Sequence, residues 1–83
     1  MGELSKLPNI GEVIEKQLNT IGIYTPEQLV SIGSKEAFFR IEIIDNTVCL
    51  HMLYALQGAV EEKRYTLLTE HTKKDLKHFF DNL

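Results

Sequence analysis

The sequence predicts a compact all-α domain of five helices, and three observations support this prediction. Apolar residues recur at spacings of three and four along most of the 83 residues, which is the period of an amphipathic helix. Glycine, proline and threonine stand where these periodic segments begin or end. Alternation of apolar and polar residues, which marks strands, is almost missing. A chain of this length builds one hydrophobic core, so we expect a single domain over residues 1–83.

The first helix is predicted over residues 11–21 and is stopped by Gly22. One face of this helix is apolar, and the outer face is expected to carry Glu12, Glu15, Lys16 and Asn19.

The second helix has the clearest boundaries. Thr25 is suited to cap its start, Pro26 fits its first position, and Gln28 completes a capping box with Thr25. Gly33 is expected to end it.

The third helix is predicted to run from Lys35 to about Ile44, with Ser34 as its cap. The pair Asp45-Asn46 breaks it.

A fourth helix is predicted from Thr47 to about Lys63, and apolar residues cover most of its circumference, so it should be buried on several sides. Cys49 is expected to be a small core residue in it. Gly58 in its interior costs about 1 kcal/mol relative to alanine, which indicates a close crossing by another helix.

The fifth helix should start near Thr69 and bury four apolar side chains, which are Leu76, Phe79, Phe80 and Leu83.

The charge and cysteine content narrow the function classes. The net charge is −3 and neither half of the chain is basic, whereas small nucleic-acid-binding domains usually carry a basic face. A single cysteine excludes an internal disulfide and is typical of a reducing compartment. The sequence holds no long uncharged apolar run and no secretory signal, so we expect a cytoplasmic protein without a membrane contact.

The segment Leu7-Pro8-Asn9-Ile10-Gly11 is typical of a helix-hairpin-helix turn. A glycine that opens a helix leaves backbone N–H groups directed outward, which suits a phosphate. In this copy Glu12 would repel that phosphate by roughly 1 kcal/mol even in water at about 5 Å. We therefore assign Pro8, Asn9, Ile10 and Gly11 a structural role in the hairpin.

The run from Leu4 to the C-terminus resembles the C-terminal domain of the TfoX (Sxy) family of bacterial competence regulators, here without an N-terminal partner domain. The resemblance rests on four motifs: Leu7-Pro8-Asn9-Ile10-Gly11, Ile21-Gly22-Ile23 with Thr25, Gly33 with Glu36-Ala37, and the string from Leu53 to Ala59. It implies an all-helical domain with a helix-hairpin-helix (SAM-like) core, in proteins linked to transcription of DNA-uptake genes. It supplies no catalytic residue and no contact surface.

The second glycine corner is the better candidate for contact with a phosphate. Gly33, Ser34 and Lys35 would present free N–H groups, a hydroxyl and an ammonium, with Arg40 further along the same helix. The alternative is a capped helix start with ordinary surface charges.

A protein contact is predicted on the third helix. Phe38, Ile41 and Ile44 can share one inward stripe, which leaves Phe39 and Ile43, spaced four apart, on a separate face. This pair could bind another protein or a second copy of the chain, and the alternative is that neighbouring helices bury it.

No catalytic centre can be assembled from the sequence. Cys49 has no assignable base, and His51, His71 and His78 follow no metal-binding spacing, so they are expected on the surface. We therefore expect no enzymatic activity, no cofactor and no metal. The leading hypothesis is a macromolecular interaction module with a protein partner, and the alternative is binding of the DNA backbone.

Overall fold

The computed structural model describes residues 2–83, and these residues form helices and turns without any strand. The five α-helices are α1 (Glu12–Thr20), α2 (Pro26–Ile32), α3 (Ser34–Ile44), α4 (Leu50–Val60) and α5 (Glu70–Asp81), joined by the short 3-10 turns η1 (Leu4–Lys6) and η2 (Tyr65–Leu67). The predicted all-α fold with five helices is confirmed.

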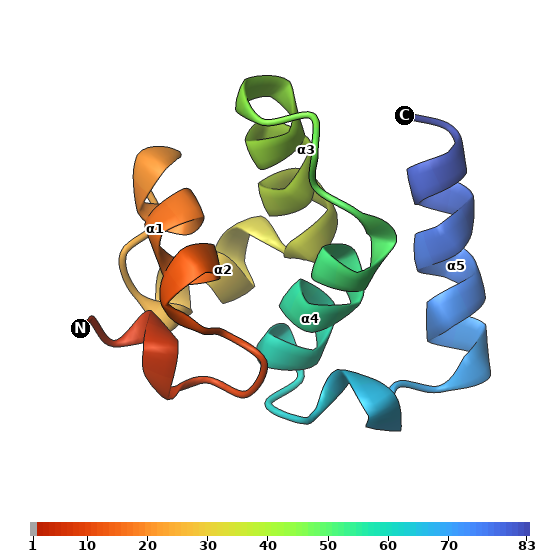
Figure 1. The fold of residues 1–83 in the computed structure, drawn as a ribbon. Coiled ribbons are helices and arrows are strands. Elements are labelled where there is room, and N and C mark those ends of the chain that lie inside the picture. The colour runs from red at the N-terminus through yellow and green to blue at the C-terminus, as the bar shows by residue number, and fades with distance from the viewer. Residues whose placement is uncertain (1) are drawn as a thin grey trace.

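Helix α4 is the centre of the domain. It packs against α2, α3, α5 and η2, and Figure 1 shows it between the first three helices on one side and α5 on the other. Its sequence explains this place, since Leu53, Leu56 and Ala59 are fully buried and Met52 and Ala55 nearly so. The largest side chains that the neighbouring elements bury are Leu4, Leu18, Leu29, Phe38, Ile41 and Leu76.

The predicted signals at the ends of α1 and α2 are confirmed. Gly22 takes a φ of +88°, and the N–H of Ile23 donates to the carbonyl of Leu18 at 2.9 Å, which closes a Schellman motif. At the start of α2, the Thr25 hydroxyl accepts from the Gln28 N–H, and the Gln28 side chain accepts from the Thr25 N–H.

Helix α4 ends in the same kind of motif as α1, but a glutamate takes the place of the glycine. The N–H of Lys63 donates to the carbonyl of Gly58 at 2.9 Å, and Glu62 between them has a φ of +56°. The predicted fourth helix is therefore too long at this end. It is also too long at its start, because the Asp45 carboxylate accepts from both the N–H and the hydroxyl of Thr47 and holds that segment in a turn.

The side chain of Asn9 joins the N-terminal turn to the end of α4. Its amide nitrogen donates to the carbonyls of Lys63 at 2.9 Å and Ala55 at 3.3 Å, and its oxygen accepts from the N–H of Tyr65 at 3.1 Å. Asn9 has a φ of +69°, a conformation that asparagine enters more readily than most residues. Through these three hydrogen bonds Asn9 holds the N-terminal turn against the end of α4.

Gly58 marks a close approach, as predicted, but the approaching segment is not a helix. A Cβ at this position would overlap the Asn9 amide and would lie 2.8 Å from the Lys63 carbonyl oxygen and 3.1 Å from the Tyr65 nitrogen. The expectation of a crossing by another α-helix was wrong because the contact is made by the Asn9 side chain and by the backbone from Lys63 to Tyr65, at the start of η2.

Three further expectations need correction. Gly33, with a φ of +86°, is both the C-cap residue of α2 and the N-cap residue of α3. Ser34 is therefore the first residue of α3 and not its cap. Glu15 is only 5% exposed, because its carboxylate accepts from the N–H groups of Gly2 and Ser5 in the turn around η1. Leu83 lies beyond the end of α5 and is 48% exposed.

The helix-hairpin-helix core stays a prediction. Helix α1 packs mainly against η1 and α3, whereas α2 packs against α3 and α4. The two helices of the expected hairpin are thus held together largely through α3.

We predict that Asn9→Ala destabilises the domain by about 2–4 kcal/mol, because it leaves the Lys63 carbonyl and the Tyr65 N–H without their partner and places alanine at a positive φ. Urea unfolding followed by circular dichroism measures this loss. Asn9→Gly is the matched variant, since glycine tolerates the backbone conformation and lacks only the three hydrogen bonds. Its free energy of unfolding should lie between those of the parent and Asn9→Ala. An Asn9→Gly protein as stable as the parent would contradict the role of the side chain.

We also predict that Gly58→Ala lowers the stability by about 1–3 kcal/mol, although alanine in an open helix position would raise it by roughly 1 kcal/mol. The added Cβ forces Asn9 and the Lys63 carbonyl to move. The change is measured as a shift of the unfolding midpoint. In the background of Asn9→Gly, which removes one of the overlapping groups, Gly58→Ala should lower the stability by a smaller amount. A higher midpoint for Gly58→Ala alone would contradict the close approach.

Candidate functional site

The outer face of α3 exposes large apolar side chains. Phe38 and Ile41 are fully buried in the core, whereas Phe39 is 41% exposed and Ile43 is 64% exposed. The two exposed residues are four apart and therefore neighbours on one face of the helix. Ile44, which was expected on the inward stripe, is 56% exposed, because α3 ends there and the chain turns at Asp45.

A groove of about 740 Å³ runs between α3 and α5, and its lining is both apolar and charged. Phe39 contributes from α3, Phe79 from α5, and Leu83 from the end of the chain. In Figure 1 the C-terminus lies near the level of the end of α3, with α5 beside α4. The groove needs two helices far apart in the sequence, so no local sequence signal predicts it.

The charges of Lys35 and Asp75 in this groove neutralise each other. The ammonium of Lys35 lies 2.6 Å from the Asp75 carboxylate and 5.7 Å from the centre of the Phe79 ring. The hydrogen bond from Lys35 holds the pKa of the Asp75 carboxyl below its usual value. A cation that was expected to attract phosphate is thus already paired with an acid.

The four residues predicted to contact phosphate lie on two different grooves. Gly33, Ser34 and Lys35 line the groove between α3 and α5. Arg40 lines another one beside the turn between α1 and α2, and its guanidinium donates to Glu36 at 2.9 Å. The structure therefore brings three of the four together.

The hydroxyl of Ser34 also has a partner inside the domain. It donates to the side-chain oxygen of Gln57 on α4, and the Gln57 amide in turn donates to Glu61 at 2.7 Å. That second hydrogen bond lowers the pKa of the Glu61 carboxyl. Ser34 is buried and joins α3 to α4, although among the described residues no side chain caps the first N–H groups of α3.

The first glycine corner has a different local chemistry. Gly11 precedes α1 in an extended conformation, and Glu12 is exposed and pairs with Lys16 at 3.5 Å. Ile10 is buried in the core, and Pro8 and Asn9 are half-buried. The turn thus supplies a core residue and the Asn9 contacts.

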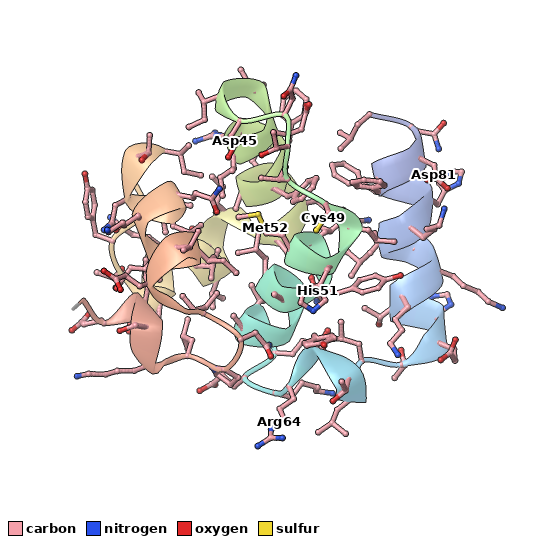
Figure 2. The ribbon with its side chains drawn as sticks, in the orientation of Figure 1. Asp45, Cys49, His51, Met52, Arg64 and Asp81 are labelled. Carbon is pink, nitrogen blue, oxygen red and sulfur yellow. The ribbon has the colours of Figure 1, made fainter. Side chains whose placement is uncertain are left out.

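Cys49 is not in the core, contrary to expectation. It is exposed and precedes α4 as its N-cap residue, because α4 starts three residues later than predicted. Figure 2 shows Cys49 and His51 at this end of α4. His51 packs its ring edge-on against Tyr65 at 4.5 Å between ring centres, and all three histidines are exposed as predicted.

Within residues 2–83, no group of three or more histidine, cysteine or acidic side chains could hold a metal ion. No helix in that range is both long enough and apolar enough to cross a bilayer.

Comparisons with known proteins identify relatives of this chain. The family model described as the TfoX C-terminal domain matches residues 1–80. Two crystal structures from Listeria monocytogenes are similar at 51% sequence identity over 95% of this chain. One is an uncharacterized protein in a triclinic form, with a TM-score of 0.94 and 90% of its chain covered. The other is a protein of unknown function in a tetragonal form, with a TM-score of 0.93 and 96% covered. No curated protein matches the chain.

Proposed function

The chain belongs to the TfoX C-terminal domain family, and from this premise we propose that it is a non-catalytic interaction module whose main partner is a protein. The family suggests a role in transcription or competence regulation. The lone exposed thiol of Cys49 supports a reducing, cytoplasmic compartment.

The exposed apolar face of α3 is the observation that carries this proposal. Phe39 and Ile43 are large apolar side chains that the fold leaves in contact with water. Full burial of an exposed side chain of this size is worth about 1.5–3 kcal/mol, and a partner that covers Phe39 and Ile43 gains the share that corresponds to their remaining exposure. Phe39 also borders the groove between α3 and α5, which gives the partner a concave surface next to the exposed pair.

DNA-backbone binding is a second candidate, and the open N–H groups at the start of α3 favour it. Three observations weigh against it. The ammonium of Lys35 is paired with Asp75, the Ser34 hydroxyl is bonded to Gln57, and the net charge is negative. We therefore rank it below a protein partner.

The double variant Phe39→Ser, Ile43→Ser should lose its protein partner, with at least a tenfold decrease in affinity, which corresponds to about 1.4 kcal/mol. Affinity capture from the native host, quantified by mass spectrometry, compares the partners of parent and variant. Val13→Ser, an exposed apolar residue on α1, is the control and should keep the parent profile. An unchanged profile for a folded double variant would count against this surface.

The variant Asp75→Asn tests the DNA candidate, because it frees the charge of Lys35 at the start of α3. We expect neither the parent nor the variant to bind duplex DNA more tightly than about 10⁻⁴ M in a fluorescence anisotropy titration. Salt-dependent binding that becomes tighter in Asp75→Asn would instead favour DNA contact at Gly33, Ser34 and Lys35.

A further inference from the structure

A separate groove of about 390 Å³ lies between α2 and the end of α4. Leu7, Val30 and Ala59 give it apolar walls, and Val30 is 55% exposed. Glu27 and Glu62 add two carboxylates. None of the residues that line this groove belongs to the α3 face or to the groove beside α5, so the two surfaces are independent.

The carboxylates of this groove are not neutralised within the described part of the chain. Neither Glu27 nor Glu62 takes part in any of the six ion pairs of residues 2–83, and no lysine or arginine lines the groove. Arg40 lines a second groove together with Glu27, but its guanidinium donates to Glu36. Lys63, next to Glu62, pairs with Glu61, and the side chain of Arg64 points away from the domain in Figure 2. This groove therefore differs from the one beside α5, where Lys35 and Asp75 cancel.

Glu62 is an unfavourable choice for the stability of the fold. It holds the left-handed position of a Schellman motif, where α1 has Gly22, and a non-glycine residue at such a φ is strained. Its negative charge also lies at the C-terminal end of a helix, where the helix dipole disfavours it. Glu27 differs, because it stands in the first turn of α2 and the dipole favours it there.

The surrounding structure holds Glu62 in this position. Asn9 bonds to the Lys63 carbonyl and to the Tyr65 N–H, so the backbone on the C-terminal side of Glu62 is fixed. Leu7, from the same N-terminal turn as Asn9, forms part of the groove wall. A rigid turn, with a strained backbone at Glu62, thus presents the Glu62 carboxylate beside the aliphatic side chains of Leu7 and Val30.

We propose that this groove binds a basic protein segment in which arginine or lysine flanks a leucine-sized aliphatic side chain. Charge complementarity selects the occupant, because two unpaired carboxylates flank an apolar surface that contains no cation. The guanidinium of an arginine can bond a carboxylate in two places while its methylene groups lie along Val30 and Leu7. The proposal does not depend on the partner of the α3 face.

The experiment uses the ¹⁵N-labelled protein and a short synthetic peptide with arginines around one leucine, followed by NMR chemical shifts. We expect salt-dependent shifts at Leu7, Val30 and Glu62. A peptide with glutamates in place of the arginines should cause none, and one with serine in place of the leucine should bind more weakly. Shifts centred on the groove beside α5, or equal shifts with the glutamate peptide, would overturn the proposal.

Variants of the two carboxylates make the test specific. The pair Glu27→Gln, Glu62→Gln should weaken peptide binding roughly three- to tenfold, as expected for two exposed ion pairs. Glu42→Gln on α3, outside the groove, is the control and should leave binding unchanged.

Glu62→Gly should raise the melting temperature and weaken peptide binding at the same time, which separates the role of the carboxylate from folding. Unchanged affinity in Glu62→Gly would overturn the proposal.

A second copy of the chain is the competing occupant, since Lys73, Lys74 and Lys77 lie together on α5. Shifts at Glu62 and at these lysines that depend on protein concentration without peptide would overturn the assignment to a foreign basic segment.

Discussion

The hydrogen bonds of the Asn9 side chain join the N-terminal turn to the end of the central helix α4. A single amide on the N-terminal turn contacts the carbonyls of Ala55 and Lys63 and the N–H of Tyr65, on the last turns of the central helix and the segment after it. These bonds require an αL conformation at Asn9 and no side chain at Gly58. The way α4 ends, and with it the path of the chain into η2 and α5, depends on this contact.

Several polar and charged side chains already have partners within the domain. Ser34 bonds Gln57, Lys35 pairs with Asp75, Arg40 pairs with Glu36, and buried Glu15 bonds the backbone of the N-terminal turn. Among residues 2–83 no buried side-chain polar atom lacks a hydrogen-bond partner. The two surfaces proposed for partners are places where the fold leaves side chains unsatisfied, namely the apolar face of α3 and the unpaired carboxylates between α2 and α4.

Local chemistry explains which boundaries the sequence could predict. The capping box of Thr25 and Gln28 and the Schellman end at Gly22 use residues within a few positions of each other. The prediction of Ser34 as a cap was wrong because Gly33 alone separates α2 from α3. The predicted C-terminal end of α4 was too late because Glu62 adopts a conformation that is typical of glycine. The prediction that Glu15 lies on the outer face was wrong because helical periodicity takes no account of N–H groups ten residues earlier in the chain.

The sequence by itself determined the all-α class, the helix order, the family and the exposed histidines, since these follow from periodicity, from capping residues and from motifs read along the chain. Only the tertiary structure decided the contacts of Asn9, which span up to 56 residues, and the pairing of Lys35 with Asp75. It also decided that Glu27 and Glu62 share one groove. The sequence predicted a structural role for the turn from Pro8 to Gly11, and only the fold shows that Asn9 in this turn holds the end of α4. The physical reason is that such contacts depend on how the helices pack, which no local spacing encodes.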